Sequence, residues 1–331
     1  MRSFLALMHA RNMEFVRDKG NLFWNLLFPI FLIFGFSFAF SGGNNELFRV
    51  GIYGDQGSRL SFLEEPYVKI VNYEKLNFAL NKVRHHQIDM VIDFEANEYF
   101  INESSTNGSV AERLFLANDE NANFEHQSLS GKPIRYVDWF VPGAIGANMM
   151  FSCIFGAGWI IVRYRRNGVL KRLKATPIHA FEFVSAQLMS RLFIVLIVSV
   201  IVYAGTNFFL KFVMEGSYLN LLLITALATV CMISLGLILA ARIRSEELAG
   251  GLMNVILWPM MAFSGIFFSL EGAPVALQKT SRIFPLTHYI EAGRAIMLDG
   301  ARLVDISTSL IILVGMSVLF LLISSLLFKW E

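Results

Sequence analysis

The most distinctive cluster of ionisable side chains lies in the segment Arg163–Pro177, which reads RYRRNGVLKRLKATP. It holds six cations and no acid within about four helical turns. The six are Arg163, Arg165, Arg166, Lys171, Arg172 and Lys174. An apolar segment lies on each side, and cations that flank membrane spans are retained in the cytoplasm. We therefore expect this basic segment to face the cytoplasm, where another protein could push on the membrane part.

Spacings typical of a catalytic or metal site are absent from the sequence. It contains no G-x-x-x-x-G-K-[ST] phosphate loop, no H-E-x-x-H motif and no G-x-S-x-G motif. The histidines are scattered, and the adjacent His85 and His86 are interpreted as a surface pair. Cys153 and Cys231 fall in apolar segments, which argues against a disulfide or a cysteine metal site. We expect no catalytic residues, cofactor or metal in this chain.

Composition indicates an integral membrane protein. Of the 331 residues 55% are apolar and only 16% are charged, which is too few for the surface of a soluble domain of this length. The net charge of +2 argues neither for nor against nucleic acid, but the cations are not interleaved with aromatic residues along a groove. No nucleic-acid partner is expected, and membrane lipids are.

Six segments are apolar and long enough to predict transmembrane helices. They are Leu22–Phe40, Phe140–Val162, Leu188–Phe209, Tyr218–Ala241, Leu248–Leu270 and Ile306–Phe328. Arg191, near the start of the third, is expected to reach the cytoplasmic interface by snorkelling. Lys329 and Trp330 are expected to anchor the last span at the interface. An even number of spans places both termini in the cytoplasm with the basic segment.

Residues 2–19 predict an amphipathic helix lying along the cytoplasmic interface, with an ordinary short helix as the alternative. Its apolar side carries Phe15, whereas Arg11 and Glu14 fall on its polar side. Residues 1–40 thus form the interfacial helix and the first span.

Residues 41–139 are polar and alternate strand-like and helix-like segments, which predicts a small α+β domain outside the cytoplasm. The predicted strands are Phe48–Tyr53, Val68–Tyr73, Met90–Phe94 and Glu98–Asn102, and the predicted helices are Glu74–His86 and Val110–Asn118. Residues 140–331 hold the other five spans, the basic segment and one further irregular stretch.

That irregular stretch, residues 271–305, is apolar but is punctuated by prolines and glycine, which predicts a re-entrant pair of half-helices. Pro285, Glu291 and Arg294 stand out within it. Glu291 and Arg294, three residues apart, either line the outer exit of a path or form a structural ion pair, and we favour the ion pair. The first five spans carry no acid deep in the bilayer, where an ion-coupled transporter usually needs one.

Several stretches together are similar to one known family. They are FVPGAIGANMM (Phe140–Met150), RRNGVLKRLKATP (Arg165–Pro177), Glu182, and the long stretch from Ser264 to Gly300 that contains SGIFF and PLT. On these residues the chain resembles the ABC-2 type transporter permeases, the membrane subunits of a class of ATP-binding-cassette exporters. The resemblance covers nearly the whole chain. Arg163 to Arg166 depart from it, because relatives commonly carry acids at the start of the basic segment.

The resemblance implies a bacterial inner-membrane permease that pairs with a second copy of itself or a related permease and with two ATPase subunits. ATP and Mg²⁺ would bind the ATPase. A coupling helix at about 165–177 would sit in a cleft of that partner. The residues assigned to this contact are Arg165, Arg166, Gly168, Leu170, Lys171, Arg172, Lys174, Thr176, Pro177 and Glu182.

Three functions are weighed. The first is an ATP-driven export permease for a hydrophobic or amphipathic substrate such as a lipid, a lipid-linked molecule or an apolar drug. The second is a membrane-anchored scaffold or receptor that displays the α+β domain without transport. The third, an ion-coupled transporter, is disfavoured by the missing intramembrane acids and by the lack of a visible inverted repeat.

Overall fold

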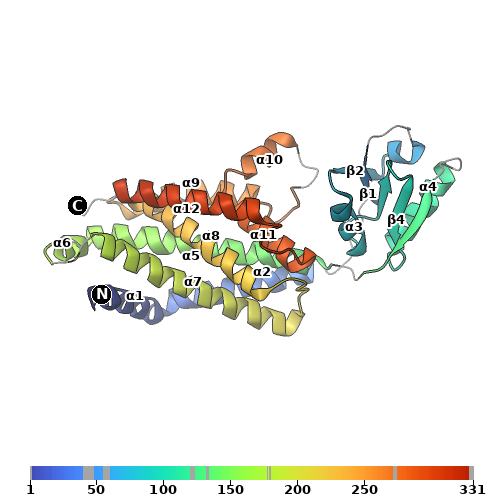
Figure 1. Ribbon diagram of the computed structural model, residues 1–331. Helices are drawn as coiled ribbons and strands as arrows, with labels where there is room; N and C mark the ends of the chain where they lie inside the picture. The colour runs from blue at the N-terminus through green and yellow to red at the C-terminus, as the bar shows by residue number, and fades with distance from the viewer. Residues whose placement is uncertain are drawn as a thin grey trace. The chain divides into compact units, whose positions relative to one another are not determined.

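A computed structural model gives the fold in two compact units, each described by itself (Figure 1). The membrane unit comprises Met1–Ala39 and Val137–Glu331, and the inserted unit comprises Phe40–Tyr136. The structure describes residues 2–39, 48–54, 60–119, 124–131, 134–176, 178, 180–270 and 274–327. The predicted interface anchors Lys329 and Trp330 lie outside the described residues, as does Pro177.

The inserted unit is built on a five-stranded sheet with the order β2-β1-β3-β4-β5. Its strands are β1 (Phe48–Tyr53), β2 (Val68–Tyr73), β3 (Met90–Asp93), β4 (Glu98–Asn102) and β5 (Glu125–Leu129). Strand β1 runs parallel to both β2 and β3, β3 is antiparallel to β4, and β4 is parallel to β5. Its other elements are η1 (Ser61–Glu64), α3 (Leu76–Arg84) and α4 (Thr106–Asn118).

Successive side chains of the central strands pack on opposite faces of this sheet. Met90 and Ile92 of β3 join one core with Phe115 of α4, whereas Val91 joins a second core with Val83 of α3. Four strands and both helices fall where the sequence predicts them, although α4 begins four residues earlier, capped by Ser105. Strand β5 was missed because its sequence, EHQSL, is polar and lies at a sheet edge.

The membrane unit consists of ten helices in the part that the structure describes. They are α1 (Arg2–Arg17), α2 (Lys19–Ala39), α5 (Tyr136–Arg166), α6 (Val169–Lys174), α7 (Ala180–Leu210), α8 (Tyr218–Ala240), α9 (Glu246–Phe263), α10 (Val275–Ser281), α11 (Pro285–Asp299) and α12 (Ser307–Leu327). The first residues of α1 and the last described residues of α12 lie at the same end of this unit as α6 (Figure 1).

Among the described residues, four helices are long and apolar enough to cross a membrane by themselves: α5, α7, α8 and α12. The pair Phe4–Arg17 and Leu22–Phe38 passes the same test together but is bent by 62°. Every predicted span coincides with a helix, and the count of six stays a prediction. Helix α9 ends at Phe263 instead of Leu270, because the chain leaves the helix at Ser264 and Gly265, where φ is +75°.

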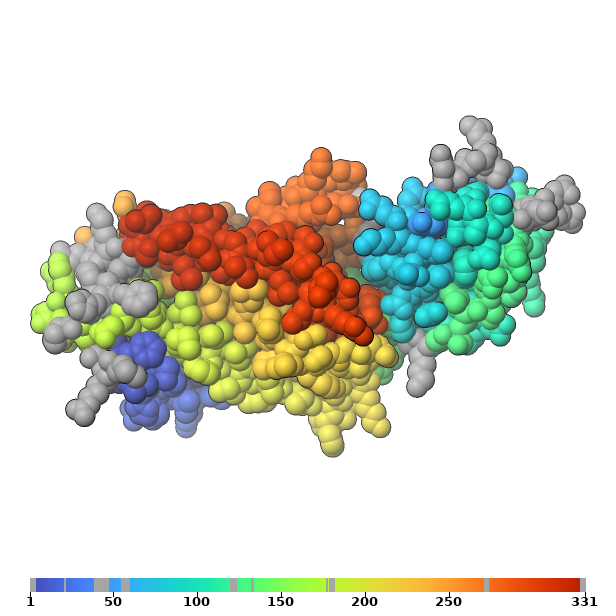
Figure 2. Space-filling model, viewed as in Figure 1, coloured from blue at the N-terminus to red at the C-terminus, as the bar shows by residue number. Residues whose placement is uncertain are grey.

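Helix α5 is the buried centre of the membrane unit, whereas α12 keeps a largely exposed apolar surface (Figure 2). Glycines let α5 approach α8 at backbone distance. A Cβ on Gly236 of α8 would lie 2.9 Å from the carbonyl oxygen of Ile154, and one on Gly158 would lie 2.9 Å from that of Gly236. The glycine-containing surface of α5 therefore packs against a helix of the same chain.

Replacing Gly236 with leucine should therefore destabilise the membrane unit. The added side chain must push α8 off α5, and such overpacking costs about 1–3 kcal/mol. Gly315→Leu in α12 is the matched control, because a Cβ there meets no atom within 4 Å. The measurement is the melting temperature of the purified protein in mild detergent. Equal melting temperatures for the two variants would contradict this description of the helix contact.

Candidate functional site: the coupling end of the helix bundle

The basic segment does not form one continuous helix. Helix α5 runs through Arg166, the chain turns at Gly168 with φ of +69°, and the six-residue α6 follows. Only glycine adopts this left-handed backbone freely, so Gly168 permits the sharp turn. The coupling helix expected at about 165–177 is therefore shorter in the structure, where α6 covers Val169–Lys174. Thr176 lies in the turn after α6, where its hydroxyl donates to the carbonyl of Leu173 at 2.6 Å.

Helix α6 has one apolar side and one cationic side. Leu170 is fully buried, whereas Lys171, Arg172 and Lys174 are exposed. Helix α6 lies at one end of the membrane unit (Figure 1), so its exposed cations form a positive surface there. This arrangement can dock against an acidic surface of another protein. Glu182 lies half-buried in the first turn of α7, the helix that follows.

Arg165 and Arg166, although assigned to the same contact, bind the membrane unit itself. The Arg165 guanidinium donates to the carbonyls of Ala240 at 2.9 Å, Ala241 at 2.8 Å and Ile243 at 2.5 Å. These carbonyls end α8, where a helix leaves acceptors without backbone donors and favours cations. Arg166 forms an ion pair with Glu246 of α9 at 3.2 Å. The two arginines thus join the end of α5 to the α8–α9 turn.

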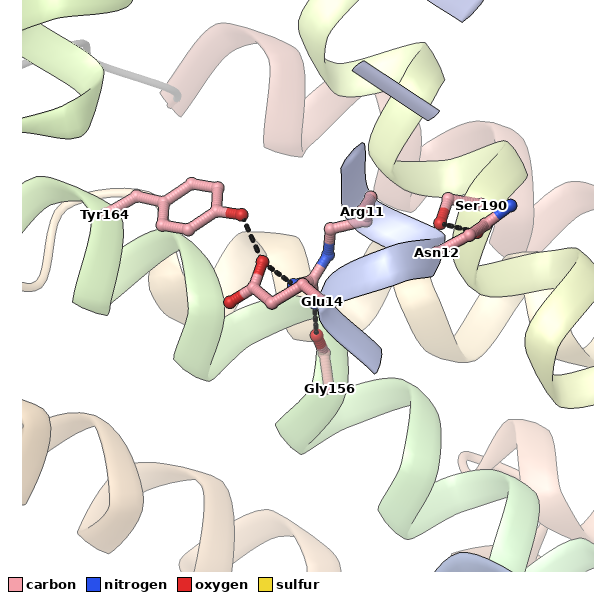
Figure 3. A network of polar contacts seen from close by, with 6 residues as sticks. All are labelled: Arg11, Asn12, Glu14, Gly156, Tyr164 and Ser190. Atoms are coloured by element: carbon pink, nitrogen blue, oxygen red, sulfur yellow. Dashed lines mark hydrogen bonds and ion pairs between the residues drawn. The ribbon is translucent and has the colours of Figure 1, made fainter. Parts of the chain in front are cut away.

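A polar network ties α1 to the same end of α5 (Figure 3). The Glu14 carboxylate accepts from the Tyr164 hydroxyl at 2.5 Å and from Arg11 at 2.8 Å. Arg11 also donates to the carbonyl of Gly156 at 3.1 Å. The expectation that Arg11 lies on an exposed polar side is wrong, because its side chain is only 6% exposed and points to α5.

On α7, the Ser190 hydroxyl donates to the Asn12 side-chain oxygen at 2.5 Å, which gives α1 a second attachment (Figure 3). Arg191, next in sequence, is also buried, with 4% of its surface exposed. It donates to the carbonyl and hydroxyl of Ser152, near the middle of α5. The predicted snorkelling of Arg191 is therefore wrong. The pattern of polar residues along α7 alone could not show that Ser152 of α5 supplies these acceptors.

The residues singled out in the stretch 271–305 lie at the other end of α5. Pro285 is buried at the first position of α11, and Glu291 is exposed. The Arg294 guanidinium stacks on the Trp139 ring, 3.4 Å from its centroid, and donates to the Trp139 carbonyl at 3.0 Å. It also donates to the Gly265 carbonyl at 2.7 Å, in the turn after α9. Residues 139 and 165 are about 40 Å apart along α5, so the two sets of site residues are not brought together.

Within the described residues, no three His, Cys, Asp or Glu side chains are grouped as metal ligands. What the geometry does define is an apolar helix bundle whose two ends are held by arginines, with a positive surface at one end. That is a membrane-embedded helical protein, and comparison with known proteins identifies the family.

The family model for the ABC-2 family transporter proteins matches residues 19–326. The chain therefore belongs to the ABC-2 family of transporter proteins, whose members are membrane permease subunits. Two curated relatives are each called an inner membrane transport permease YhhJ, one from Escherichia coli (strain K12) and one from Shigella flexneri. Each is 30% identical over 162 residues, which are 48% of this chain and 42% of the relative. The match thus spans less than half the length of these relatives.

Removal of the Tyr164 hydroxyl should loosen α1. Tyr164→Phe deletes a hydrogen bond to a carboxylate, a class of bond that contributes about 1.5–3 kcal/mol. Amide hydrogen exchange in α1 should then become roughly ten- to a hundredfold faster, since about 1.4 kcal/mol is a factor of ten. Tyr67→Phe in the inserted unit is the control. Unchanged exchange in α1 of Tyr164→Phe would mean that the network does not hold this helix.

Proposed function

We propose that this chain is the permease subunit of an ABC exporter that moves a hydrophobic or amphipathic substrate across the bacterial inner membrane. The observation that carries the proposal is the exposed cationic side of α6 on a chain that belongs to a transporter family but has no phosphate-binding loop of its own. Energy then comes from a separate ATPase. ATP and Mg²⁺ bind that partner, and the permease works as a dimer with a second copy or a related permease.

The proposed topology has six spans with both termini and α6 in the cytoplasm, and the inserted unit on the other side. Support comes from the cations at residues 2–19, 163–174 and 242–244, because a cytoplasmic location of all three groups requires this arrangement. The shared end of α1, α6 and α12 agrees with it (Figure 1). A scaffold that only displays the inserted unit is the alternative, and it gives no role to the cations of α6.

In the proposed mechanism, nucleotide-driven closure of the ATPase presses on α6. Leu170 and the short turn at Gly168 pass this force to α5, and the Arg165 and Arg166 contacts pass it on to α8 and α9. The helix bundle then changes between inward-open and outward-open forms. From the sequence alone, all these cations are assigned to one contact with the ATPase. In the proposed mechanism Lys171, Arg172 and Lys174 contact the partner, whereas Arg165 and Arg166 transmit the force.

Charge reversal on α6 tests this proposal. Lys171→Glu with Arg172→Glu should reduce coupled ATP hydrolysis by roughly tenfold or more, because like charges then face each other at the contact. The matched control reverses the exposed Lys279 and Arg282, which lie in and beside α10. Activity is measured on the permease co-expressed with a candidate ATP-binding-cassette ATPase from the same organism, and a melting temperature close to that of the parent protein shows that the variant folds.

Copurification with this ATPase from mild detergent separates the proposal from the alternative. The parent protein and the α10 variant should retain the ATPase, and the α6 variant should lose it. Retention by a folded α6 variant with normal coupling would contradict the assigned contact. A scaffold without transport would retain no ATPase in any variant.

A further inference from the structure

A pocket of about 420 Å³ lies in the membrane unit between α2 and α5, with α7 behind it. Aromatic side chains form its two walls. Trp24 and Phe28 come from α2, and Phe151, Phe155 and Trp159 follow one another at helical spacing on α5. The α5 rings form a continuous stripe, since consecutive centroids are 6.3 and 5.9 Å apart. Trp24 keeps 63% of its surface exposed, so the α2 wall is accessible from outside the unit.

The back of this pocket is polar. Asn148 and Ser152 of α5 line it, and Arg191 of α7 reaches it from the other side. These groups lie near the middle of α5, because that helix runs from Tyr136 to Arg166. An aromatic entrance and a polar base are the features of a site for an amphipathic molecule.

Among the residues that the structure describes, no carboxylate forms an ion pair with Arg191. Its guanidinium is held by the carbonyl and hydroxyl of Ser152 and by the face of the Phe15 ring, with its Cζ 5.6 Å from the centroid. Within the described part of the chain these are all its partners, and Nη1 has no acceptor. A buried charge without a counter-ion is costly, and in a membrane protein it marks a substrate path.

The remaining charges at the pocket lie at its cytoplasmic end. Asp18 and Arg163 line the pocket there, with opposite charges. Arg163 is eleven residues from Ser152, or about 16 Å along α5, so it does not bind the same group as Arg191. The net charge of the lining is +1, from one acid and two arginines.

The close contact between α1 and α5 keeps this pocket in shape. Gly156 lines it, and its carbonyl accepts from Arg11 in the network of Figure 3. Gly156 also leaves room for Arg191, because a Cβ there would overlap the guanidinium. Arg191 is thus placed by both the packing and the hydrogen bonds of α5.

We infer that this pocket binds an amphiphile with one anionic head group, its phosphate or carboxylate on Arg191, Ser152 and Asn148 and its apolar chain between the aromatic walls. This rests on the proposed function, whose substrate class it narrows from hydrophobic or amphipathic molecules to anionic amphiphiles. The same chemistry could come from a bilayer phospholipid or from the exported molecule, and the experiment distinguishes the two.

Brominated amphiphiles quench tryptophan fluorescence on contact, and Trp24 and Trp159 lie in the walls. The protein in phosphatidylcholine nanodiscs is titrated with 11-bromoundecyl phosphate, 11-bromoundecanol and 11-bromoundecyl trimethylammonium. The phosphate should reach half-quenching at a concentration about tenfold or more below that of the alcohol. The reason is that hydrogen bonds between charged partners add enough binding free energy for an affinity difference of about this size. Trp24→Phe should remove part of this quenching.

In Arg191→Gln, the phosphate should give half-quenching at the same concentration as the alcohol. Arg302→Gln changes an exposed arginine of the same unit, and in this variant the phosphate should still give half-quenching at the lower concentration. Equal quenching by phosphate and alcohol in the parent protein would overturn the inference without any variant, as would a preference for the trimethylammonium compound. A folded Arg191→Gln protein that retained the preference would overturn the role of Arg191.

A second arm adds the ATPase partner and measures ATP hydrolysis with and without the phosphate amphiphile. Stimulation that is lost in Arg191→Gln assigns the site to the exported molecule, and binding without stimulation assigns it to a resident phospholipid. Failure of the proposed function can be distinguished from failure of this inference, because the quenching experiment contains no ATPase and the copurification test does not depend on Arg191.

Discussion

The membrane unit depends on α5, a helix of 31 residues whose apolar length is mostly buried inside the protein instead of facing lipid. Backbone carbonyls at the ends of such a helix and of its neighbours need hydrogen-bond donors from the protein, because no water is available to supply them. At each end of α5 an arginine supplies these donors. Arg165 binds the carbonyls that end α8, and Arg294 binds those of Trp139 and Gly265. In between, glycines allow α8 to pack directly on the α5 backbone.

These arginines change how the basic segment is understood. Six cations and no acids indicate one charged surface, but in the structure these cations differ in their contacts. Arg165 and Arg166 face the neighbouring helices, whereas Lys171, Arg172 and Lys174 remain on the outer side of α6. The separation occurs at Gly168, whose left-handed backbone ends α5 and starts α6 in a new direction. Helices α5 and α6 are therefore joined by a turn and do not form one continuous helix.

Much of the fold follows from local patterns, and the buried polar contacts do not. Long apolar runs and alternating strands are properties of neighbouring residues, so the helices and four of the five strands were predictable. Strand β5 was not, because EHQSL becomes a strand only through its pairing with β4. Arg11 and Arg191 were placed at a surface because charge favours water. Their acceptors, on Gly156 and Ser152, come from 145 and 39 residues away, and no spacing rule connects them. At the candidate site, the sequence predicts the cluster of cations as a group. It does not predict that Arg165 and Arg166 bind neighbouring helices while the cations of α6 stay exposed.

The glycine contact between α5 and α8 has a mechanical consequence. Gly158 and Gly236 bring the two backbones so close that a Cβ on either glycine would lie 2.9 Å from a carbonyl oxygen of the facing helix. Arg165 fastens the ends of the same pair. These two helices must therefore travel together as one rigid block. Any opening of the bundle has to occur where side chains alone separate the helices, as on the side of α5 that faces α2.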